Sequence, residues 1–533
     1  MNKKILYTIY LFLVTLPCSR CTHKTETPHY FEPQYLNEFI KQYPAVKAHK
    51  NNLQIFYTGN QYSFAWFDHD GLNDYAENFI QRIHHEKNAL PDFYSNRLDD
   101  LHNTVSKKKY KFKNTDSTAL QLELFLTSGF FEYAKNNWED MGDGNFKKTG
   151  WLIQCEKIDY PAVLDSLLKA DSREIAEFEP LCPQFKLLKR YAEKYAEADS
   201  NGGWPVPGLK TTVLKKETSS PEITGIKKLL FLMGDLHTND GSTLFDDALE
   251  TAVQKFQKRH GLKQDGIIAG KTLAAMRVPL SERRKQIAFN MQRCRCMPVN
   301  MTGDNIRVNI PEYMLYVYES DNLQWACEVV VGNDSNNTAV FSDYMEKIVF
   351  SPYWHVPKSI LFKETIPAVK ENPNYLAEHN MEVTDEAGNA IDPSQVDWDV
   401  PEENFHYMIR QKPGSDNSLG RVKFLLPNSH SIYLHDTPAK SLFGENERAF
   451  SHGCIRVSEP LKLAQYLLRH NTEWSTDSIR SAMYGEKEIT VKLPEKVPVY
   501  ITYFTAWVDA NGDLNFREDI YEHDEKMKKL LPL

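Results

Sequence analysis

The spacing of apolar residues changes along the chain from a helical to a strand-like pattern. Residues 75–83 and 120–133 carry apolar side chains at intervals of three and four, as does much of the chain from about 30 to 200. Residues 226–233 and 244–256 repeat this spacing. Such intervals are typical of amphipathic helices, so the first half of the chain is predicted to be helical.

From about residue 303 apolar and polar residues alternate instead. Ile306, Val308 and Ile310 share one side of this alternation, and residues 314–318 and 327–331 are β-rich runs. An alternation with a period of two predicts strands that are buried on one face. The second half of the chain is therefore predicted to be mostly β.

Breaker residues and an irregular stretch divide the chain further. Residues 201–205 form a Gly-rich breaker cluster, and a helical, loop-rich insertion interrupts the strands. The predicted fold is multidomain: an α-helical N-terminal domain, a smaller helical module, and a mostly-β domain with a helical/loop insertion. The boundaries are 30–200 for the helical domain, 222–278 for the module, 303–505 for the mostly-β domain, 358–408 for its insertion and 506–533 for a C-terminal extension.

Composition agrees with a soluble multidomain protein. The chain has 533 residues, of which 41% are hydrophobic and 25% charged, and its formal net charge is −9. Such a length exceeds what one hydrophobic core usually supports. The negative charge argues against a nucleic-acid partner, which requires a basic face. We expect no cofactor.

Residues 1–21 have the composition of an export signal. A basic start precedes an apolar run over 5–16, which is the length of a signal-peptide core and short for a membrane span. Cys18 and Cys21 suggest a lipoprotein, yet neither follows a good lipobox. Lipidation, a cleaved signal and an uncleaved anchor stay open, and we expect export to the bacterial periplasm or cell envelope.

Two segments carry the parts of a thiol acyl-transfer site. Residues 450–457 read Phe-Ser-His-Gly-Cys-Ile-Arg-Val, and His435 lies upstream in the run Tyr-Leu-His-Asp. Cys454 would be the nucleophile and His435 its base, because a thiol needs a nearby imidazole to react at neutral pH. Gly453 permits close backbone approach, and N–H groups there could stabilise an oxyanion. On these residues alone, the alternative is a buried structural cysteine beside unrelated histidines.

The residues around this motif resemble a known family. Residues 411–414, 417–420, 435–438, 451–457 and Arg448 closely resemble the YkuD-type L,D-transpeptidases, most of all their large YcbB-type members. The resemblance implies a bacterial cell-wall enzyme whose cysteine is acylated by a peptidoglycan stem tetrapeptide. The acyl group then passes to the side-chain amine of a second stem, which makes a 3→3 cross-link. It also implies acylation by carbapenems.

The resemblance assigns roles to the other domains as well. The helical domain would be a supporting scaffold, the insertion a lid, and the module a three-helix peptidoglycan-binding domain. For the module, bracing of the catalytic domain is the alternative to wall targeting, because Gln257 and His260 could be structural. The expected partners are peptidoglycan stem peptides as donor and acceptor, other wall-synthesis enzymes and, through the N-terminus, the membrane.

Strand alternation suggests how the base is oriented. Neighbouring side chains on a strand point to opposite faces, so Asp436 is not expected to orient the His435 ring. A backbone carbonyl is expected to fix its tautomer instead. Arg456 shares a side with Cys454 if the segment is extended, and either holds a substrate carboxylate or forms a structural salt bridge.

The remaining site residues are candidates for substrate contacts. Ser451 and His452 could hydrogen-bond the acyl carbonyl or the incoming amine, although His452 could instead only cap the turn. Further substrate-binding candidates are Tyr433, Trp354 and Tyr407. The sequence departs from the family pattern at His355, which stands where an asparagine is usual and would alter the polarity of the pocket.

Three other functions stay open. His435, His452 and Cys454 are chemically sufficient for a zinc site, although the resembling family is metal-free and we expect none. The same thiol could pass its acyl group to water, as an L,D-carboxypeptidase, or to a wall-anchored protein. A binding-only wall protein is the third option, which an intact nucleophile and base oppose.

The cysteines outside the motif and the N-terminal segment have no zinc spacing. They are Cys155, Cys182, Cys294, Cys296 and Cys327. We interpret Cys294 and Cys296 as packing positions, because they fall where the resembling family has two arginines and because one intervening residue suits neither a ligand knuckle nor a disulfide. A disulfide between Cys155 and Cys182 is a candidate in an oxidising compartment.

Overall fold

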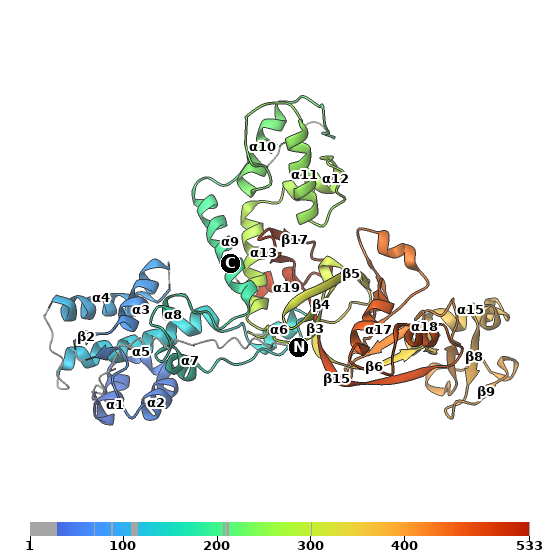
Figure 1. Ribbon diagram of the computed structural model, residues 1–533, viewed down its shortest axis with the longest axis horizontal. Coiled ribbons are helices and arrows are strands. Elements are labelled where there is room, and N and C mark those ends of the chain that lie inside the picture. The colour runs from blue at the N-terminus through green and yellow to red at the C-terminus, as the bar shows by residue number, and fades with distance from the viewer. Residues whose placement is uncertain are drawn as a thin grey trace, which may run out of the picture. The chain divides into compact units, whose positions relative to one another are not determined.

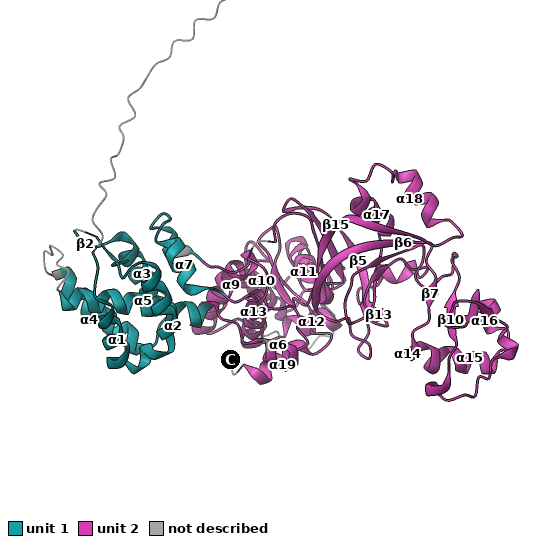
Figure 2. Cartoon of the chain, turned by 90° about the horizontal axis from the view of Figure 1, so that it is seen from below, with its two compact units in different colours: residues 1–137, 158–178 teal, residues 138–157, 179–533 magenta. Residues whose placement is uncertain are grey.

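The computed structural model describes residues 29–531, except 69, 87–88, 108–115, 206–207, 209–212 and 300. The predicted export signal at 1–21 lies outside these residues. The chain divides into two compact units (Figure 2): unit 1 is formed by the residues up to 137 and by 158–178, and unit 2 by 138–157 and 179–533. Among the described helices, none has both the length and the apolar content to cross a membrane.

Unit 1 is helical, as the periodicity predicts. It contains α1 (Pro33–Gln42), α2 (Lys50–Gly59), α3 (Asp74–His85), α4 (Asp92–Lys107), α5 (Ser117–Trp138), α7 (Tyr160–Leu167) and α8 (Glu174–Glu177), a 3-10 turn (Pro44–His49) and the short pair β1 (Phe67–Asp68) and β2 (Gly71–Leu72). The buried carboxylate of Glu123 on α5 accepts hydrogen bonds from the N–H groups of Ala65 and Trp66 and from the hydroxyl of Tyr57. Burial raises the pKa of Glu123 to about 7. The network connects α2 to α5 and is structural, as expected of a supporting scaffold.

Unit 2 contains several helices outside its insertion. They are α6 (Asp143–Lys148), α9 (Pro183–Ser200), α10 (Glu222–Met233), α11 (Asp247–Arg259), α12 (Gly270–Met276), α13 (Leu280–Cys294), α17 (Pro460–Leu468), α18 (Thr476–Met483) and α19 (His523–Leu530). The predicted boundary at 200 places α9 in the N-terminal helical domain. In the structure α9 packs along α13 within unit 2.

Helices α10–α12 enclose an apolar core of their own. Ile226 and Leu230 of α10 pack with Leu249, Val253 and Phe256 of α11 in this core. The side-chain amide of Gln257 donates to Asp265 at 2.9 Å and to Thr272 at 3.1 Å, both within the module. Gln257 is therefore structural, as the bracing alternative predicts.

The module is also fixed to the C-terminal extension. This extension contains the hairpin of β16 (Ala506–Val508) and β17 (Leu514–Phe516), with its turn at Asn511-Gly512. Arg259 of α11 donates to the backbone carbonyl of Leu514, and the His260 ring stacks on Phe516 with centroids 5.5 Å apart. The module thus braces unit 2, whether or not it also binds the wall.

The predicted Cys155–Cys182 disulfide is wrong. Cys155 is bonded to Cys296, 141 residues further along the chain, so Cys296 is more than the packing residue we expected. Cys182 lies just before α9 and contacts Cys294 of α13, and both are free and buried. The packing of α9 along α13 brings these two thiols together, which leaves Cys155 to pair with the cysteine just beyond α13.

A nine-stranded sheet forms the core of the catalytic region (Figure 1). Its strands are β3 (Asn305–Asn309), β4 (Met314–Glu319), β5 (Asn322–Gly332), β6 (Phe341–Phe350), β11 (Val422–Leu425), β12 (Leu434–His435), β13 (Ala449–Ser451), β14 (Ile455–Val457) and β15 (Ile489–Thr502), in the order β13-β5-β14-β12-β11-β6-β15-β3-β4. The long strand β5 also pairs with β4, so the sheet closes on itself. The mostly-β prediction is confirmed.

The insertion has its own small sheet, which the sequence did not predict. The strands β7 (Trp354–His355), β8 (Met381–Thr384), β9 (Ala390–Ile391) and β10 (Met408–Gln411) pair in the order β7-β10-β8-β9, beside α14 (Lys358–Ile360), a π-helical turn (Leu361–Thr365), α15 (Ile366–Glu371) and α16 (Tyr375–Glu378). A separate apolar core includes Leu361, Val369, Val383, Phe405 and Ile409. The insertion is thus a packed subdomain rather than a loose loop.

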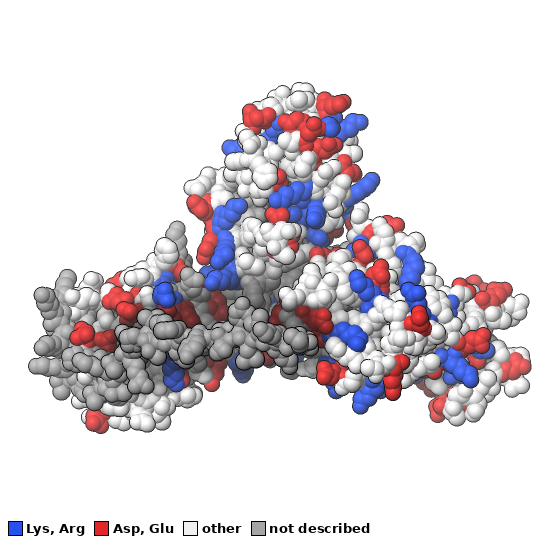
Figure 3. Space-filling view, viewed as in Figure 1, with Lys and Arg blue, Asp and Glu red and all other residues white. Residues whose placement is uncertain are grey.

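Charge on the surface is mixed in sign. On the face drawn in Figure 3, basic and acidic side chains are interspersed over the described residues. A nucleic-acid partner would favour an extended basic face, so the drawn surface agrees with the composition.

Candidate active site

The parallel pairing of β12 with β14 brings the two motif segments together. Leu434 lies opposite Ile455, and His435 lies opposite Arg456. Leu434 and Ile455 are fully buried beneath the sheet. Because side chains alternate between faces, Tyr433, His435, Cys454 and Arg456 share the other face.

The ring of His435 is oriented by a backbone carbonyl, as predicted. Its Nδ1 lies 2.5 Å from the carbonyl oxygen of Asp436. A carbonyl can only accept, so Nδ1 carries the proton and Nε2 keeps the lone pair of a base. The Asp436 carboxylate is turned away and accepts from the N–H of Arg421 at 2.8 Å and from Lys440 at 2.5 Å.

His435 is a neutral imidazole over the physiological range. Burial, and then the positive charge of Arg456, lower the pKa of His435 to about 4. The ring is therefore free to accept a proton at any pH well above that value. It is only 4% exposed, so water does not compete strongly for its lone pair.

The thiol of Cys454 is half-buried and protonated at rest. Burial raises the pKa of Cys454, while hydrogen bonding from Tyr433 and the charge of Arg456 oppose this shift. Its Sγ lies 3.6 Å from the carbonyl oxygen of Ser431. Between the two described side chains of Cys454 and His435 there is no hydrogen bond, a separation that catalytic pairs often show before substrate tightens them.

A glycine turn presents Cys454, the candidate nucleophile. Gly453 has φ +111°, a region that other residues rarely adopt. Its N–H donates to Oγ of Ser451 at 3.1 Å, and that hydroxyl donates to the carbonyl of Cys454 at 2.6 Å. Ser451 therefore holds the turn; its predicted contact with substrate stays a prediction.

The turn is held from behind by residues that sequence reasoning missed. Thr338 donates through Oγ1 to the carbonyl of Gly453 at 2.8 Å and accepts from the N–H of Gly332 at 2.8 Å. The hydroxyl of Tyr521 donates to the carbonyl of Gly332 at 2.5 Å and accepts from the N–H of Thr338 at 3.3 Å. The C-terminal extension thus supports the nucleophile, although it lies beyond the predicted catalytic boundary at 505.

Replacing Tyr521 with Phe should slow acylation of Cys454. The variant loses both hydrogen bonds to the 332–338 loop, each of which contributes about 0.5–1.5 kcal/mol to stability. The loop, whose Thr338 donates to the carbonyl of Gly453, then holds the turn less firmly. We expect a fall of roughly tenfold in the acylation rate, about 1.4 kcal/mol. The matched control is Tyr466→Phe on α17. It removes a hydroxyl that donates to the carbonyl of Tyr318 at 2.7 Å. Equal rates in the two variants, at equal melting temperatures, would contradict a positioning role.

Arg456 has no ion-pair partner in the described part of the chain. Its Nε is buried without a hydrogen bond, and burial lowers the pKa of its guanidinium. The alternative of a structural salt bridge therefore lacks a carboxylate partner among the described residues. Its holding of a substrate carboxylate stays a prediction, and its positive charge acts on both Cys454 and His435.

Three other predicted residues belong to or contact the insertion. Nε2 of His452 lies 3.1 Å from the carboxylate of Glu364, in the π-helical turn of the insertion, and both side chains are exposed. Trp354 and Tyr407 pack against the apolar core of the insertion. The predicted contacts of Trp354 and Tyr407 with substrate stay predictions. His355 pairs with Arg410 where the insertion joins the sheet.

The zinc alternative loses its geometric basis. In the described part of the chain, the groups whose ligand atoms lie within 4.8 Å of one another are Asp140 with Cys155 and Cys296, and Asp304 with Glu319 and His470. His435, His452 and Cys454 do not converge in this way.

Comparison with known families assigns three parts of the chain. Residues 303–501 match the YkuD family, described as the L,D-transpeptidase catalytic domain. Residues 51–191 match a "Scaffold domain". Residues 220–276 match a "Putative peptidoglycan binding domain".

A curated relative agrees with the family match. A Haemophilus influenzae protein named "Putative L,D-transpeptidase" is 36% identical over 243 residues, 46% of this chain and 49% of the relative. The chain thus spans about half the length of that relative.

Solved structures of L,D-transpeptidases are similar at lower identity. The enzyme from Xylanimonas cellulosilytica is 13% identical, with 55% of this chain and 99% of that chain covered and a TM-score of 0.17. The enzyme from Stackebrandtia nassauensis is 12% identical, with 55% and 97% covered and a TM-score of 0.23. L,D-transpeptidase 3 from Mycobacterium tuberculosis, solved with a faropenem-derived adduct, is 13% identical, with 38% and 60% covered and a TM-score of 0.19. At these scores the structural likenesses carry no argument. The similarity rests on the family matches: residues 303–501 match the YkuD L,D-transpeptidase catalytic domain, beside matches to a "Scaffold domain" and a "Putative peptidoglycan binding domain".

Proposed function

We propose that this protein is an L,D-transpeptidase that forms 3→3 cross-links in peptidoglycan through a thioester on Cys454. The observation that carries the proposal is the shared face of the sheet. It presents a half-buried thiol on a glycine turn, beside an imidazole whose basic nitrogen is left free by a backbone hydrogen bond on the other nitrogen. These are the nucleophile, the base and the orienting group of covalent acyl transfer.

The acylation step begins with two neutral groups. The donor stem displaces the thiol from the Ser431 carbonyl, and Nε2 of His435 takes the proton from Sγ as sulfur attacks the carbonyl of the third stem residue. The bond from this carbonyl to the nitrogen of the fourth residue then breaks, and the imidazolium returns its proton to the leaving amine. A thioester and a free D-amino acid result.

Backbone and charge would stabilise the negative charge that develops. The N–H of Gly453 is engaged by Ser451, whereas the N–H of Cys454 donates no hydrogen bond within the described residues. This N–H is therefore available to the oxyanion, where one donor contributes about 3 kcal/mol. Arg456 would add positive charge on the same face or hold a carboxylate of the stem.

The acceptor completes the reaction. The side-chain amine of a second stem gives up a proton to His435 as it attacks the thioester, and Cys454 leaves as a thiol. Water in place of the amine would give a tripeptide, and a protein amine would anchor that protein. The exposed His452–Glu364 contact joins the turn to the insertion, so the insertion is positioned to act as a lid during this exchange.

An exported protein in the cell envelope fits this substrate. The Cys155–Cys296 disulfide supports an oxidising compartment, because disulfides persist there and are rare in the cytosol. Membrane anchoring and contacts with other wall-synthesis enzymes stay proposals.

The direct test is incubation of the purified protein with disaccharide-tetrapeptide, followed by mass spectrometry. We expect a dimer joined through the third residues, together with released D-amino acid. Tripeptide without dimer would assign a carboxypeptidase instead, and unchanged substrate would reject the proposal.

A further inference from the structure

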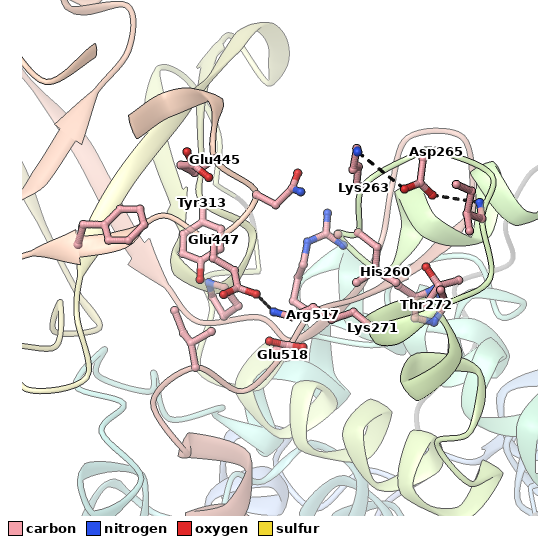
Figure 4. A pocket seen from close by; sticks show the side chains of 18 residues that line it. His260, Lys263, Asp265, Lys271, Thr272, Tyr313, Glu445, Glu447, Arg517 and Glu518 are labelled. Atoms are coloured by element: carbon pink, nitrogen blue, oxygen red, sulfur yellow. Dashed lines mark hydrogen bonds and ion pairs between the residues drawn. The ribbon is translucent and has the colours of Figure 1, made fainter. Parts of the chain in front are cut away.

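A pocket lies where the module, the catalytic domain and the C-terminal extension meet (Figure 4), and a second pocket shares part of its lining. The first has a volume of about 460 Å³ and the second about 410 Å³. They share His260, Leu262, Lys271, Arg517 and Glu518, so the two pockets lie next to each other along the extension. Each alone has the size of a small-ligand site, and the pair suits a longer chain.

The walls of these pockets are fixed before any ligand arrives. Gly261 has φ +66°, and a Cβ at this position would lie 2.6 Å from Cδ and Nε of Arg517. Arg517 in turn donates to the carbonyl of Arg259 at 3.0 Å. The module therefore contacts the extension at a position where a side chain larger than that of glycine would collide with Arg517. This contact fixes the loop after α11 against the extension.

The lining carries charges of both signs. Lys263 and Lys271 come from the module, and Glu445, Glu447 and Glu518 lie opposite or beside them. Figure 4 shows Lys271 and Glu447 joined across the pocket, and both side chains are more than half exposed. An exposed pair of this kind contributes little stability, so a ligand with its own charges can replace it. The carboxylates disfavour a phosphate-rich ligand and suit one that bears both carboxylates and amines.

An exposed aromatic side chain links the pocket to the nucleophile. Phe450 lines the pocket, is 45% exposed and contacts no other aromatic ring among the described residues. On β13 its neighbour Ser451 points the opposite way and holds the turn of Cys454. Phe450 stands four residues before Cys454, so their Cα atoms lie at most about 14 Å apart. A polymer bound over Phe450 would therefore lie beside the segment that carries Cys454.

We propose that this pocket binds the glycan–peptide strand of peptidoglycan, with the sugar over Phe450 and the charged stem groups between Lys271 and Glu447. The inference rests on the transpeptidase function proposed above. It deepens that function by locating the wall-binding face of the module at its edge toward the catalytic domain. Binding there would hold the polymer so that one of its stems is presented to Cys454 at a raised local concentration.

The test uses the full chain and purified sacculi, with point variants because deleting the module would remove its bracing contacts. In Lys263→Glu/Lys271→Glu, sacculus affinity in a pelleting assay should fall at least tenfold. Phe450→Leu, which keeps an apolar side chain but removes the ring, should lower it about fivefold, as loss of an aromatic anchor does. Acylation of Cys454 by a carbapenem should stay within twofold in the double variant, because this small molecule needs only the catalytic pocket.

The matched control is Lys228→Glu/Lys258→Glu, an equal charge change at exposed positions of α10 and α11 outside both pockets. Sacculus affinity in the Lys263→Glu/Lys271→Glu variant equal to that of the control would overturn the pocket assignment. So would an equal loss of sacculus binding and carbapenem acylation, which would reveal bracing alone. If the pocket variants lose sacculus binding while the wild type forms no dimer from disaccharide-tetrapeptide, the pocket stands and the transpeptidase proposal fails.

Discussion

Replacing Cys454 with Ala should abolish acylation by both the stem peptide and a carbapenem. The thioester needs sulfur, and a methyl group in its place leaves the Gly453 turn and its hydrogen bonds to Ser451 intact. We expect a loss of at least about 10⁴-fold, near 5.5 kcal/mol of transition-state stabilisation. Intact-mass measurement should show the carbapenem adduct on the wild type and none on the variant, while the melting temperature stays close to that of the wild type.

The control for this experiment is another buried thiol. Cys327 lies on β5, and burial raises the pKa of its thiol to about 11. It is therefore a poor nucleophile, and Cys327→Ala should still acquire the adduct. An adduct on Cys454→Ala, or its loss in Cys327→Ala without unfolding, would place the nucleophile elsewhere.

The reactive centre could be predicted because it is local. A glycine turn, a strand of period two and the rule that neighbours point apart place Cys454, His435 and the Asp436 carbonyl from short stretches of sequence. Nothing in those stretches reports the pKa of His435, since burial and Arg456 both depend on how β12 and β14 pair.

Residues that act across long separations could not be found in this way. Thr338 and Tyr521 are 183 residues apart, and their contact arises only when the C-terminal extension packs beneath the sheet. The Cys155–Cys296 pairing depends in the same way on the packing of α9 along α13. A sequence motif reports only how far apart residues are along the chain. These contacts depend on which distant segments pack together in the folded protein.

The sheet of the insertion was missed for a different reason. Its strands are only two to four residues long. A period of two needs about four or more residues to be recognised. Trp354 and Tyr407 were assigned to substrate as aromatic residues near the site, and the core of this subdomain accounts for their burial.

Replacing His435 with Ala should slow acylation about 10²- to 10⁴-fold at pH 7, the range in which general-base catalysis contributes. In the variant only the thiolate reacts, so the rate should rise about tenfold per pH unit. The rise should continue past the ordinary cysteine pKa of about 8.5, because burial raises the pKa of Cys454. The wild type should behave differently. With the pKa of His435 lowered to about 4, its base stays unprotonated, and the carbapenem acylation rate should be level down to about pH 5.

His470→Ala is the matched control, because this exposed histidine follows α17 and is no part of the candidate site. Its acylation rate and pH profile should stay close to those of the wild type. Two results would count against His435 as the base: a wild-type rate that falls with a midpoint near pH 6.5, the ordinary value for histidine, or a His435→Ala rate that is independent of pH. The first would mean that the imidazole is solvated and not buried against Arg456. The second would mean that proton removal from Cys454 does not limit acylation, and the role of His435 would then be to position the thiol.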